Sequence, residues 1–277
     1  MRIGLIGIDS SHADDFLRLF NEQHRFHDAS VTAFWSHDGD AARIGEITNI
    51  DSSIASAVSL DTLLGQVDAV LVGSRDGGLH RDHALAAIAA GRPTFIDKPL
   101  ALTVDDAEAI LDAGERAGVP VCSASALRWQ DDTVMLKARL AYLERPLAIE
   151  ANGTWYPASP YGGAVFYAVH TIELVQELLG TDWRNVVRDG AAGIVCDIAG
   201  VKVTLRFSPP KQEGSHFSVT ASCADKTITQ RVALPDDYMA PVAQRLVDMV
   251  RIGISPLNRE QLLAPVLMMQ AIDKALA

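Results

Sequence analysis

The chain has 277 residues, 48% of them hydrophobic and 21% charged, and a net charge of −11 at pH 7. This composition predicts a globular protein of about two domains and lacks the clustered positive charge that nucleic acid or anionic lipid requires. Its three cysteines, Cys122, Cys196 and Cys223, fit neither a disulfide framework nor a metal motif, which favours a reducing cytoplasm. We expect no signal peptide and no membrane span.

The first half of the chain alternates predicted strands and helices. The pattern predicts strands at 2–8, 31–35, 69–72, 94–96 and 119–123, and helices at 12–24, 41–47, 60–64, 80–90 and 104–117. Such alternation is typical of βαβ units joined by right-handed crossovers. We therefore expect a Rossmann domain with a doubly wound parallel sheet over residues 1–124.

The rhythm changes in the second half. The pattern predicts strands at 147–156, 186–188, 192–198, 201–207, 216–223 and 227–234, and helices at 164–179, 241–252 and 259–275. Short polar turns between these strands favour antiparallel pairing. We expect an α+β domain over residues 125–277 with an open, largely antiparallel sheet, and we allow for the terminal helix packing back on the first domain.

The most informative motif is Asp97-Lys98-Pro99, which directly follows the short strand 94–96. In an open parallel sheet, ligands bind beyond the carboxyl ends of the strands. A lysine at that place, followed by a proline that fixes the next φ, is suited to present an ammonium group to a substrate hydroxyl. The alternative is an ordinary surface ion pair.

An acid-Lys-Pro motif at the end of a Rossmann strand, after a helix that ends in Ala90-Gly91, resembles the Gfo/Idh/MocA oxidoreductases, where the motif is usually Glu-Lys-Pro. The resemblance implies NAD or NADP on the Rossmann domain and hydride transfer between a sugar or polyol carbon and the nicotinamide. An α+β substrate domain follows in that family.

The run 162–173 resembles a helix motif of the same family, in which an Asp and a His lie four residues apart on one face. His170 is kept, whereas Phe166 stands at the Asp position. The resemblance assigns acid–base work to His170, with Lys98 polarising the oxygen. Glu173 lies on the same helix face and is expected to orient the imidazole, and Asp97 supports Lys98.

The loop after the first strand should carry the phosphate-binding pattern Gly-x-Gly-x-x-Gly, and only its first glycine is present. A carboxylate at Asp9 would repel a diphosphate by on the order of 1 kcal/mol, although Asp9 or Ser10 also suits a helix N-cap. Ser10 and Ser11 are able to donate hydrogen bonds to an anion at this helix start. The candidate cofactor residues here are Gly7, Ile8, Asp9, Ser10, Ser11 and His12.

The second strand ends at Trp35 without the acid that holds the ribose hydroxyls of NAD. Ser36 followed by His37 is closer to an NADP pattern, so we expect NADP or NAD and the pattern favours NADP; both residues also suit an ordinary surface. In the family that the chain resembles, the loop after the strand 69–72 lies beside the cofactor. The resemblance therefore adds Ser74, Arg75 and His80 to the candidate cofactor residues. No metal site is expected, since His80 and His83 supply at most two ligands.

On the substrate side, the resemblance points to Arg128, and the loop aromatics Trp155 and Tyr156 suit a sugar ring or a protein core. Phe166 makes the pocket more apolar than an Asp would. The leading prediction is an NAD(P)-dependent oxidoreductase acting on a sugar, polyol or related hydroxy compound. The alternatives are a non-catalytic member that binds a small molecule or protein, and a member that uses the cofactor for elimination or glycoside cleavage.

The predicted sheet of the second domain has one face that needs cover. Alternating apolar residues at 201–207 and 217–220 therefore predict a homodimer or homotetramer formed through this sheet.

Overall fold

A computed structural model of the chain describes residues 1–143, 145–210 and 217–276. The structure divides into two compact units. The first contains residues 1–124 and 237–258, and the second contains residues 125–236 and 259–277. The first segment of this unit ends at residue 124, the position that the sequence analysis gave for the boundary. Residues 237–258, which the sequence analysis placed in the second domain, belong to the first unit.

The first unit contains a six-stranded parallel sheet with the strand order β3-β2-β1-β4-β5-β6. This is the Rossmann order, with the change of direction between β1 and β4. The strands are β1 (Arg2–Ile6), β2 (Ser30–Trp35), β3 (Ala55–Ser56), β4 (Ala69–Val72), β5 (Thr94–Ile96) and β6 (Val121–Ser123).

Helices of this unit follow their sequence signals closely. In α5 (Val104–Ala117), Thr103 caps the N-terminus by accepting the Asp106 N–H, and Gly118 ends the helix at φ +65°. The other helices are α1 (Ser11–Leu17), which continues as a π-helical segment (Arg18–Glu22), α2 (Ala41–Ile50), α3 (Leu60–Gln66), α4 (His80–Ala89) and α8 (Ala240–Ile252), and a 3-10 turn spans Gly77–Leu79.

Helix α8 belongs to the first unit, although it comes late in the chain. Arg251 forms an ion pair with Asp28, and Tyr238, just before the helix, donates a hydrogen bond to Asp15 over 3.1 Å. The terminal helix α9 (Arg259–Leu276) instead buries Met268 in the core of the second unit. The sequence analysis allowed for the terminal helix joining the first domain; the division of the chain assigns α9 to the second unit and the preceding helix α8 to the first.

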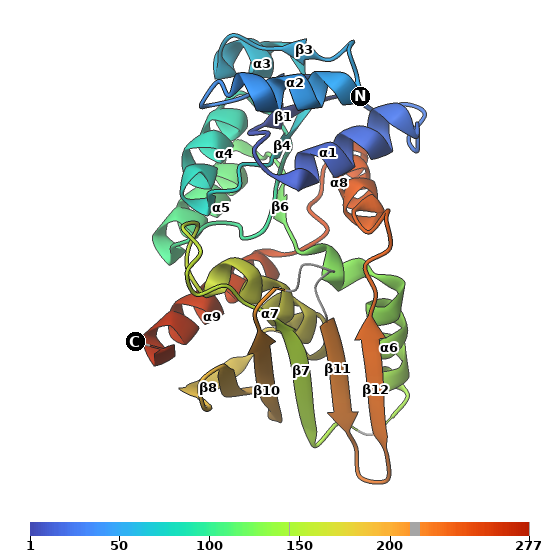
Figure 1. Cartoon of the computed structure of the whole chain (residues 1–277), viewed down its shortest axis with the longest axis vertical. Coiled ribbons are helices and arrows are strands. Elements are labelled where there is room, and N and C mark those ends of the chain that lie inside the picture. The colour runs from blue at the N-terminus through green and yellow to red at the C-terminus, as the bar shows by residue number, and fades with distance from the viewer. Residues whose placement is uncertain (144, 211–216, 277) are drawn as a thin grey trace. The chain divides into compact units, whose positions relative to one another are not determined.

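The second unit contains a six-stranded sheet with the order β12-β11-β7-β10-β9-β8 (Figure 1). Strands β7 and β10 run parallel and every other neighbouring pair is antiparallel. The strands are β7 (Ala148–Thr154), β8 (Trp183–Arg188), β9 (Gly193–Ile198), β10 (Val201–Ser208), β11 (Phe217–Ser222) and β12 (Thr227–Val232). The predicted strand 216–223 begins at a position outside the described residues.

Strand β10 shows how this sheet is covered. Val201, Val203 and Leu205 are fully buried in the core with α7 (Val165–Leu179) and α9, while Lys202 and Arg206 between them are exposed. The apolar residues that were expected to form a subunit interface therefore already fill the protomer's own core, because they lie on the helix-covered face.

Two local elements of the second unit were not predicted. A 3-10 turn (Ala126–Trp129) leads into helix α6 (Asp131–Ala141), which buries only Thr133, Leu136 and Leu140. Exposed Val134 and Met135 blur this narrow stripe. Among the helices in the described ranges, none is long and apolar enough to cross a membrane.

Candidate active site

The loop between β1 and α1 passes very close to the end of β4. Gly7 has φ +82°, and a Cβ at this position would lie 2.3 Å from Ser74 Oγ and 2.7 Å from the Ser74 nitrogen. Only glycine fits this approach without displacing the neighbouring backbone. The single glycine kept from the phosphate pattern is thus the one that makes the tight turn between the two central strands.

The sequence left open whether Asp9 or Ser10 caps the first helix, and the structure gives the two residues different partners. Ser10 is the N-cap of α1, and its Oγ accepts the His12 N–H over 3.3 Å. The Asp9 carboxylate accepts the Arg75 N–H, with oxygen–nitrogen distances of 3.1 and 3.2 Å. The Asp9 charge is therefore held by the loop after β4.

Arg43 of α2 binds the loop between β1 and α1, and the sequence analysis did not single this arginine out. Its guanidinium donates to the carbonyl oxygens of Ile8 and Ser10 and lies 2.7 Å from an Asp14 carboxylate oxygen. An arginine with five donors is well suited to hold two carbonyls and a carboxylate together. An arginine on the polar side of a short helix gives no sequence signal for this role.

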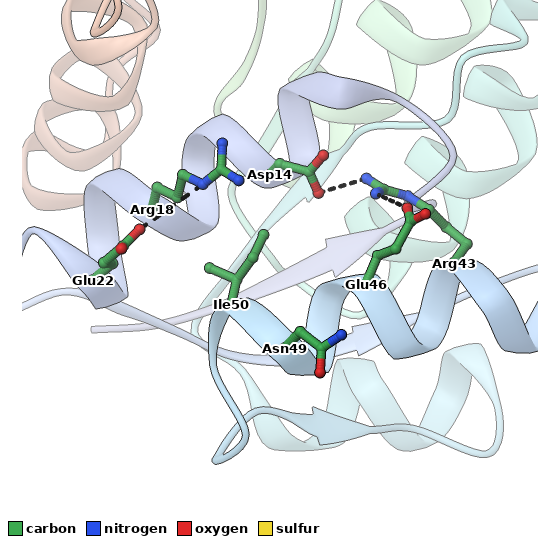
Figure 2. Close-up of a pocket in the computed structure, with 7 residues that line it drawn as sticks. All are labelled: Asp14, Arg18, Glu22, Arg43, Glu46, Asn49 and Ile50. Carbon is green, nitrogen blue, oxygen red and sulfur yellow. Dashed lines mark hydrogen bonds and ion pairs between the residues drawn. The ribbon is translucent and has the colours of Figure 1, made fainter.

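Arg43 also lines a charged hollow of about 470 Å³ between α1 with its π-helical continuation and α2. Figure 2 shows the side chains that line it. Arg43 pairs with Glu46 at 2.8 Å, and Arg18 pairs with Glu22 at 3.8 Å. Each charged side chain that lines the hollow thus has an ion-pair partner among the other lining residues. The hollow is therefore a groove between two helices that salt bridges hold together.

Asp97 and Lys98 are both buried at the end of β5, so the ordinary surface ion pair is excluded. Asp97 Oδ2 lies 2.9 Å from His12 Nδ1. Burial opposes the ionised form of Asp97, but the positive charges of His12 and Lys98 and the hydrogen bond from His12 outweigh it and hold the Asp97 pKa below its usual range. The acid of the motif thus links the lysine to the first turn of α1.

His80 connects two loops of the same unit. Its Nδ1 lies 2.8 Å from the Pro99 carbonyl oxygen and its Nε2 lies 2.8 Å from the Ser74 carbonyl oxygen. His80 thus lies beside the loop after β4, and both of its ring nitrogens face protein carbonyls. Among the residues described, no group of three or more His, Cys, Asp or Glu side chains is arranged to hold a metal.

The ends of β2 and β4 carry a small aromatic cluster. Ser74 Oγ lies 3.0 Å from His83 Nδ1, and the His83 ring meets Trp35 edge-on with centroids 5.5 Å apart. The His37 ring is 6.3 Å from His83. Burial, with the charges of His80 and His37, lowers the pKa of His83 to about 4. Ser36 turns its hydroxyl to Asp38, 2.6 Å away.

This buried histidine predicts a pH dependence of stability. The pKa of His83 is about 4 in the folded chain against 6.5 for a free side chain, so the unfolded chain takes the proton first. The stabilisation from neutral His83 is complete above pH 6.5 and is lost as pH falls to 4, by roughly 2–3 kcal/mol. His83→Asn should flatten the urea-unfolding free energy in this window. An unchanged slope between pH 6.5 and 4 would contradict the assignment.

In the second unit, His170 lies on α7, which packs closely on β7. A Cβ at Gly153 of β7 would lie 1.8 Å from Thr171 Oγ1, so glycine is needed for this approach. His170 Nδ1 is 2.8 Å from Ser125 Oγ. The Phe217 ring meets the imidazole edge-on with centroids 5.9 Å apart. The imidazole is therefore held between a hydroxyl and an aromatic edge.

The expected roles of Glu173 and Arg128 need correction. Glu173 Oε2 accepts the Arg128 Nε–H over 2.6 Å and the Ser125 N–H over 2.8 Å, so it reaches the imidazole through Ser125. The Arg128 side chain is only 1% exposed, and its Nη1 lies 3.1 Å from Glu177. Arg128 thus forms a buried ion pair with two glutamates where a substrate contact was expected.

The predicted substrate aromatics separate into core and surface. Trp155 is buried and stacks on Phe207 with centroids 5.2 Å apart, which is the core alternative. Tyr156 is 45% exposed. Phe166 is buried, and its ring lies 5.5 Å from Tyr161 and 4.9 Å from Tyr167. An aromatic group, with no hydrogen-bonding atom, thus replaces the expected acid one turn before His170.

The residues of the β1–α1 loop fit a bound dinucleotide. Gly7 makes the close turn between β1 and β4, the place where Rossmann sheets hold the pyrophosphate. The Asp9 carboxylate is engaged by the Arg75 N–H, which reduces its repulsion of phosphate. The exposed Ser11 follows the Ser10 cap.

A protein-family model described as an oxidoreductase family with an NAD-binding Rossmann fold, Gfo/Idh/MocA, matches residues 1–125. Inositol 2-dehydrogenase of Klebsiella pneumoniae is 44% identical over 127 residues, which cover 43% of this chain and 37% of that protein. 1,5-Anhydro-D-fructose reductase of Ensifer adhaerens is 33% identical over 157 residues, covering 55% and 41%. The chain therefore spans less than half the length of these curated relatives.

Solved structures share the fold over nearly the whole chain. Scyllo-inositol dehydrogenase of Lactobacillus casei, solved with NAD(H) and scyllo-inositol, superposes with a TM-score of 0.81 at 13% identity and covers 99% of this chain and 96% of that one. At this identity the likeness establishes the two-domain fold.

Proposed function

Residues 1–125 belong to the Gfo/Idh/MocA family of oxidoreductases with an NAD-binding Rossmann fold, and from this premise we propose that the chain transfers a hydride between a nicotinamide cofactor and a sugar, polyol or related hydroxy compound. The observation that carries the proposal is the buried Asp97-Lys98 pair at the end of β5, tied through His12 to the first turn of α1. The motif thus fixes the lysine next to an ionised carboxylate at the end of the strand.

We assign the acid–base role to His170 and the polarising role to Lys98. Because His170 Nδ1 faces the Ser125 hydroxyl, Nε2 is the atom that exchanges a proton with the substrate hydroxyl. The role that the family resemblance implies for the Lys98 ammonium is to polarise the substrate oxygen and stabilise the charge that develops on it. The nicotinamide, when bound, supplies the site that accepts or returns the hydride. Gly7, Ser11 and Ser74 are the residues that we expect beside it.

The choice between NAD and NADP depends on residues 36–38. The Ser36-His37 pair favoured NADP, but Asp38 accepts the Ser36 hydroxyl hydrogen bond. That bond and the Asp40 N–H lower the pKa of Asp38, so a carboxylate stays ionised in the loop that would meet a 2′-phosphate. We therefore propose NAD as the tighter-binding cofactor. The relative from Lactobacillus casei was solved with NAD(H).

Titration of the purified chain with NADH and NADPH, followed by nicotinamide fluorescence, tests cofactor binding. We expect micromolar affinity for NADH, weaker binding of NADPH, and a smaller preference in Asp38→Asn. A screen of inositols, sugars and other polyols with the bound cofactor then tests the reaction. A folded chain that binds neither cofactor up to millimolar concentration would overturn the proposal and favour the non-catalytic binding protein.

Phe166 supports a substrate that differs from a fully hydroxylated polyol at one position. Its ring contacts Tyr161 and Tyr167 one turn before His170, where the family resemblance places an acid. An acid there would accept a substrate hydroxyl, whereas a phenyl group favours a carbon–hydrogen face. We therefore place deoxy or partly reduced ring compounds first in the substrate screen.

We also propose a homodimer or homotetramer formed through the outer face of the second unit's sheet. Glu150, Lys202 and Arg206 are exposed on this face, so the interface would be polar. Light scattering coupled to size exclusion checks the mass, and a clean monomer would contradict it. No disulfide joins the cysteines in the part of the chain that the structure describes, which is consistent with the cytoplasmic location that we propose.

A further inference from the structure

His80 is a fully buried histidine whose two ring nitrogens both face backbone carbonyl oxygens. Its Nδ1 lies 2.8 Å from the Pro99 oxygen and its Nε2 lies 2.8 Å from the Ser74 oxygen, and the residue is 0% exposed. A carbonyl oxygen carries no proton, so it can only accept a hydrogen bond. The two contacts therefore require a donor at each ring nitrogen.

A neutral imidazole cannot meet this requirement in either tautomer. It has one N–H, so a neutral His80 would turn a bare nitrogen toward a carbonyl oxygen at one of the two contacts. Two buried acceptors that face each other at hydrogen-bond distance are both left unsatisfied. The imidazolium has an N–H on each nitrogen and satisfies both carbonyls. The geometry thus selects the charged form of His80.

Burial opposes a charged imidazole, and a nearby anion offsets this effect. Asp97 at the end of β5 supplies that anion. Although burial raises the pKa of this buried carboxyl, nearby positive charges, His80 among them, hold it below its usual range. His83, one turn later on α4, is neutral at pH 7, because burial and the charges of His80 and His37 lower its pKa to about 4. The ionisable groups that interact with His80 are thus one carboxylate and one neutral imidazole, and both permit a cation there.

The place of His80 in the fold brings these two carbonyls within its reach. Strands β4 and β5 pair in parallel, so the loops that follow them leave the same edge of the sheet. His80 ends the 3-10 turn Gly77–Leu79 in the first of these loops and begins α4. A Cβ at Gly77 would lie 3.0 Å from Leu102, so this turn also packs closely on the chain after Pro99. His80 therefore joins two loops at the edge where a parallel sheet binds its ligands.

We propose that His80 stays an imidazolium in the folded chain at neutral pH and is a positioning residue for Lys98, which it fixes relative to the loop after β4; this rests on the proposed function. Pro99, whose carbonyl His80 holds, directly follows Lys98, so a shift of this carbonyl moves the lysine backbone. Ser74, at the other contact, is a residue that we expect beside the nicotinamide. A misplacement of about 1 Å can lower a rate by on the order of 10²-fold. The two hydrogen bonds of His80 thus set the place of Lys98 beside the cofactor.

Two-bond ¹H–¹⁵N correlation spectra of the full chain read the protonation state of His80 without any assay of activity. The His80 signals are assigned through bonds from its own backbone, so the measurement needs no variant. At about pH 7.5, one unit above the usual histidine pKa of about 6.5, we expect both His80 nitrogens to be protonated. His83, a buried histidine on the same helix, is the matched control and should have one bare nitrogen. A bare nitrogen on His80 at this pH would overturn the proposal.

Steady-state turnover tests the positioning role. In His80→Gln the side-chain amide can donate to one carbonyl only, and we expect kcat to fall roughly 10- to 100-fold. If His80 acts through Lys98, the same substitution should lower the residual turnover of Lys98→Met by less than about threefold. His83→Gln is the control, and its effect on kcat should be the same with and without Lys98. His80→Asn takes the place of His80→Gln if that variant does not fold.

The two hypotheses fail separately. Equal losses from His80→Gln in the wild-type and Lys98→Met backgrounds would show a role that does not pass through Lys98, and would overturn the proposal while the proposed function stands. A doubly protonated His80 in a chain that binds neither NADH nor NADPH would uphold the buried imidazolium. That outcome would overturn the proposed function and, with it, the positioning role.

Discussion

Lys98→Arg should lower kcat by roughly 10²- to 10⁴-fold while leaving the fold and NADH binding nearly unchanged. Arginine keeps the positive charge beside the buried Asp97, so the charge that helps to lower the pKa of this carboxyl is preserved. Its broad guanidinium cannot take the place of a compact ammonium group against a substrate oxygen. A polarising or acid–base group typically contributes a factor of this size. Stopped-flow or steady-state turnover, with thermal unfolding alongside, measures both effects.

Lys98→Met removes the positive charge beside Asp97 together with the ammonium group, whereas Lys98→Arg removes only the ammonium group. It should lose turnover to the same extent and should also lose stability, because Asp97 then keeps His12 as its neighbouring cation and loses Lys98. Lys202, exposed on β10, supplies the control, and Lys202→Arg should behave as wild type. Turnover by Lys98→Arg within threefold of wild type would remove Lys98 from the mechanism and leave it a purely structural role.

Arg128→Leu should destabilise the chain by about 3–5 kcal/mol, the usual cost of breaking a buried ion pair by removing one partner. The substitution leaves the Glu173 carboxylate, almost fully buried, with the Ser125 N–H and without its cation. Urea unfolding monitored by tryptophan fluorescence measures the loss. Arg184→Leu provides the control, because Arg184 is 72% exposed and its pair with Asp182 is worth little.

The double variant Arg128→Leu/Glu173→Gln sharpens this prediction. Removing both charges eliminates the uncompensated carboxylate. The double variant should therefore be markedly more stable than the single variant Arg128→Leu. Additive losses in the double variant would show that the two groups do not depend on each other. They would then contradict the ion pair as the reason for the burial of Arg128.

The fold was largely predictable because its signals are local. Strands β4 and β5 and helix α5 have the bounds that hydrophobic runs, the Thr103 cap and Gly118 predict. Helix α6 was missed because its buried stripe is narrow, with Val134 and Met135 exposed beside it. The destination of α8 was missed for another reason. The sequence of an amphipathic helix shows that one face is buried, but it does not show which element covers that face.

The places of the candidate site residues in the fold were predictable only where a motif carries them. Asp97, Lys98 and His170 follow from their place in the sequence, and they lie at the ends or faces of the expected elements. Arg43 and Ser125 do not, because each acts through a contact with residues 33 and 45 positions away in the chain. Arg128 was assigned to substrate because sequence shows a charged residue at a domain start but not the two glutamates that bury it.

The return of residues 237–258 to the first unit has a consequence for how the chain is made. Helix α8 buries Val242, Leu246 and Val247, so the first 124 residues leave the ribosome without the helix that completes their unit. They must wait, with part of their apolar surface uncovered, while the whole intervening segment is translated. The unit that would hold the dinucleotide therefore becomes complete late in synthesis, and cutting the gene after residue 124 would not yield it.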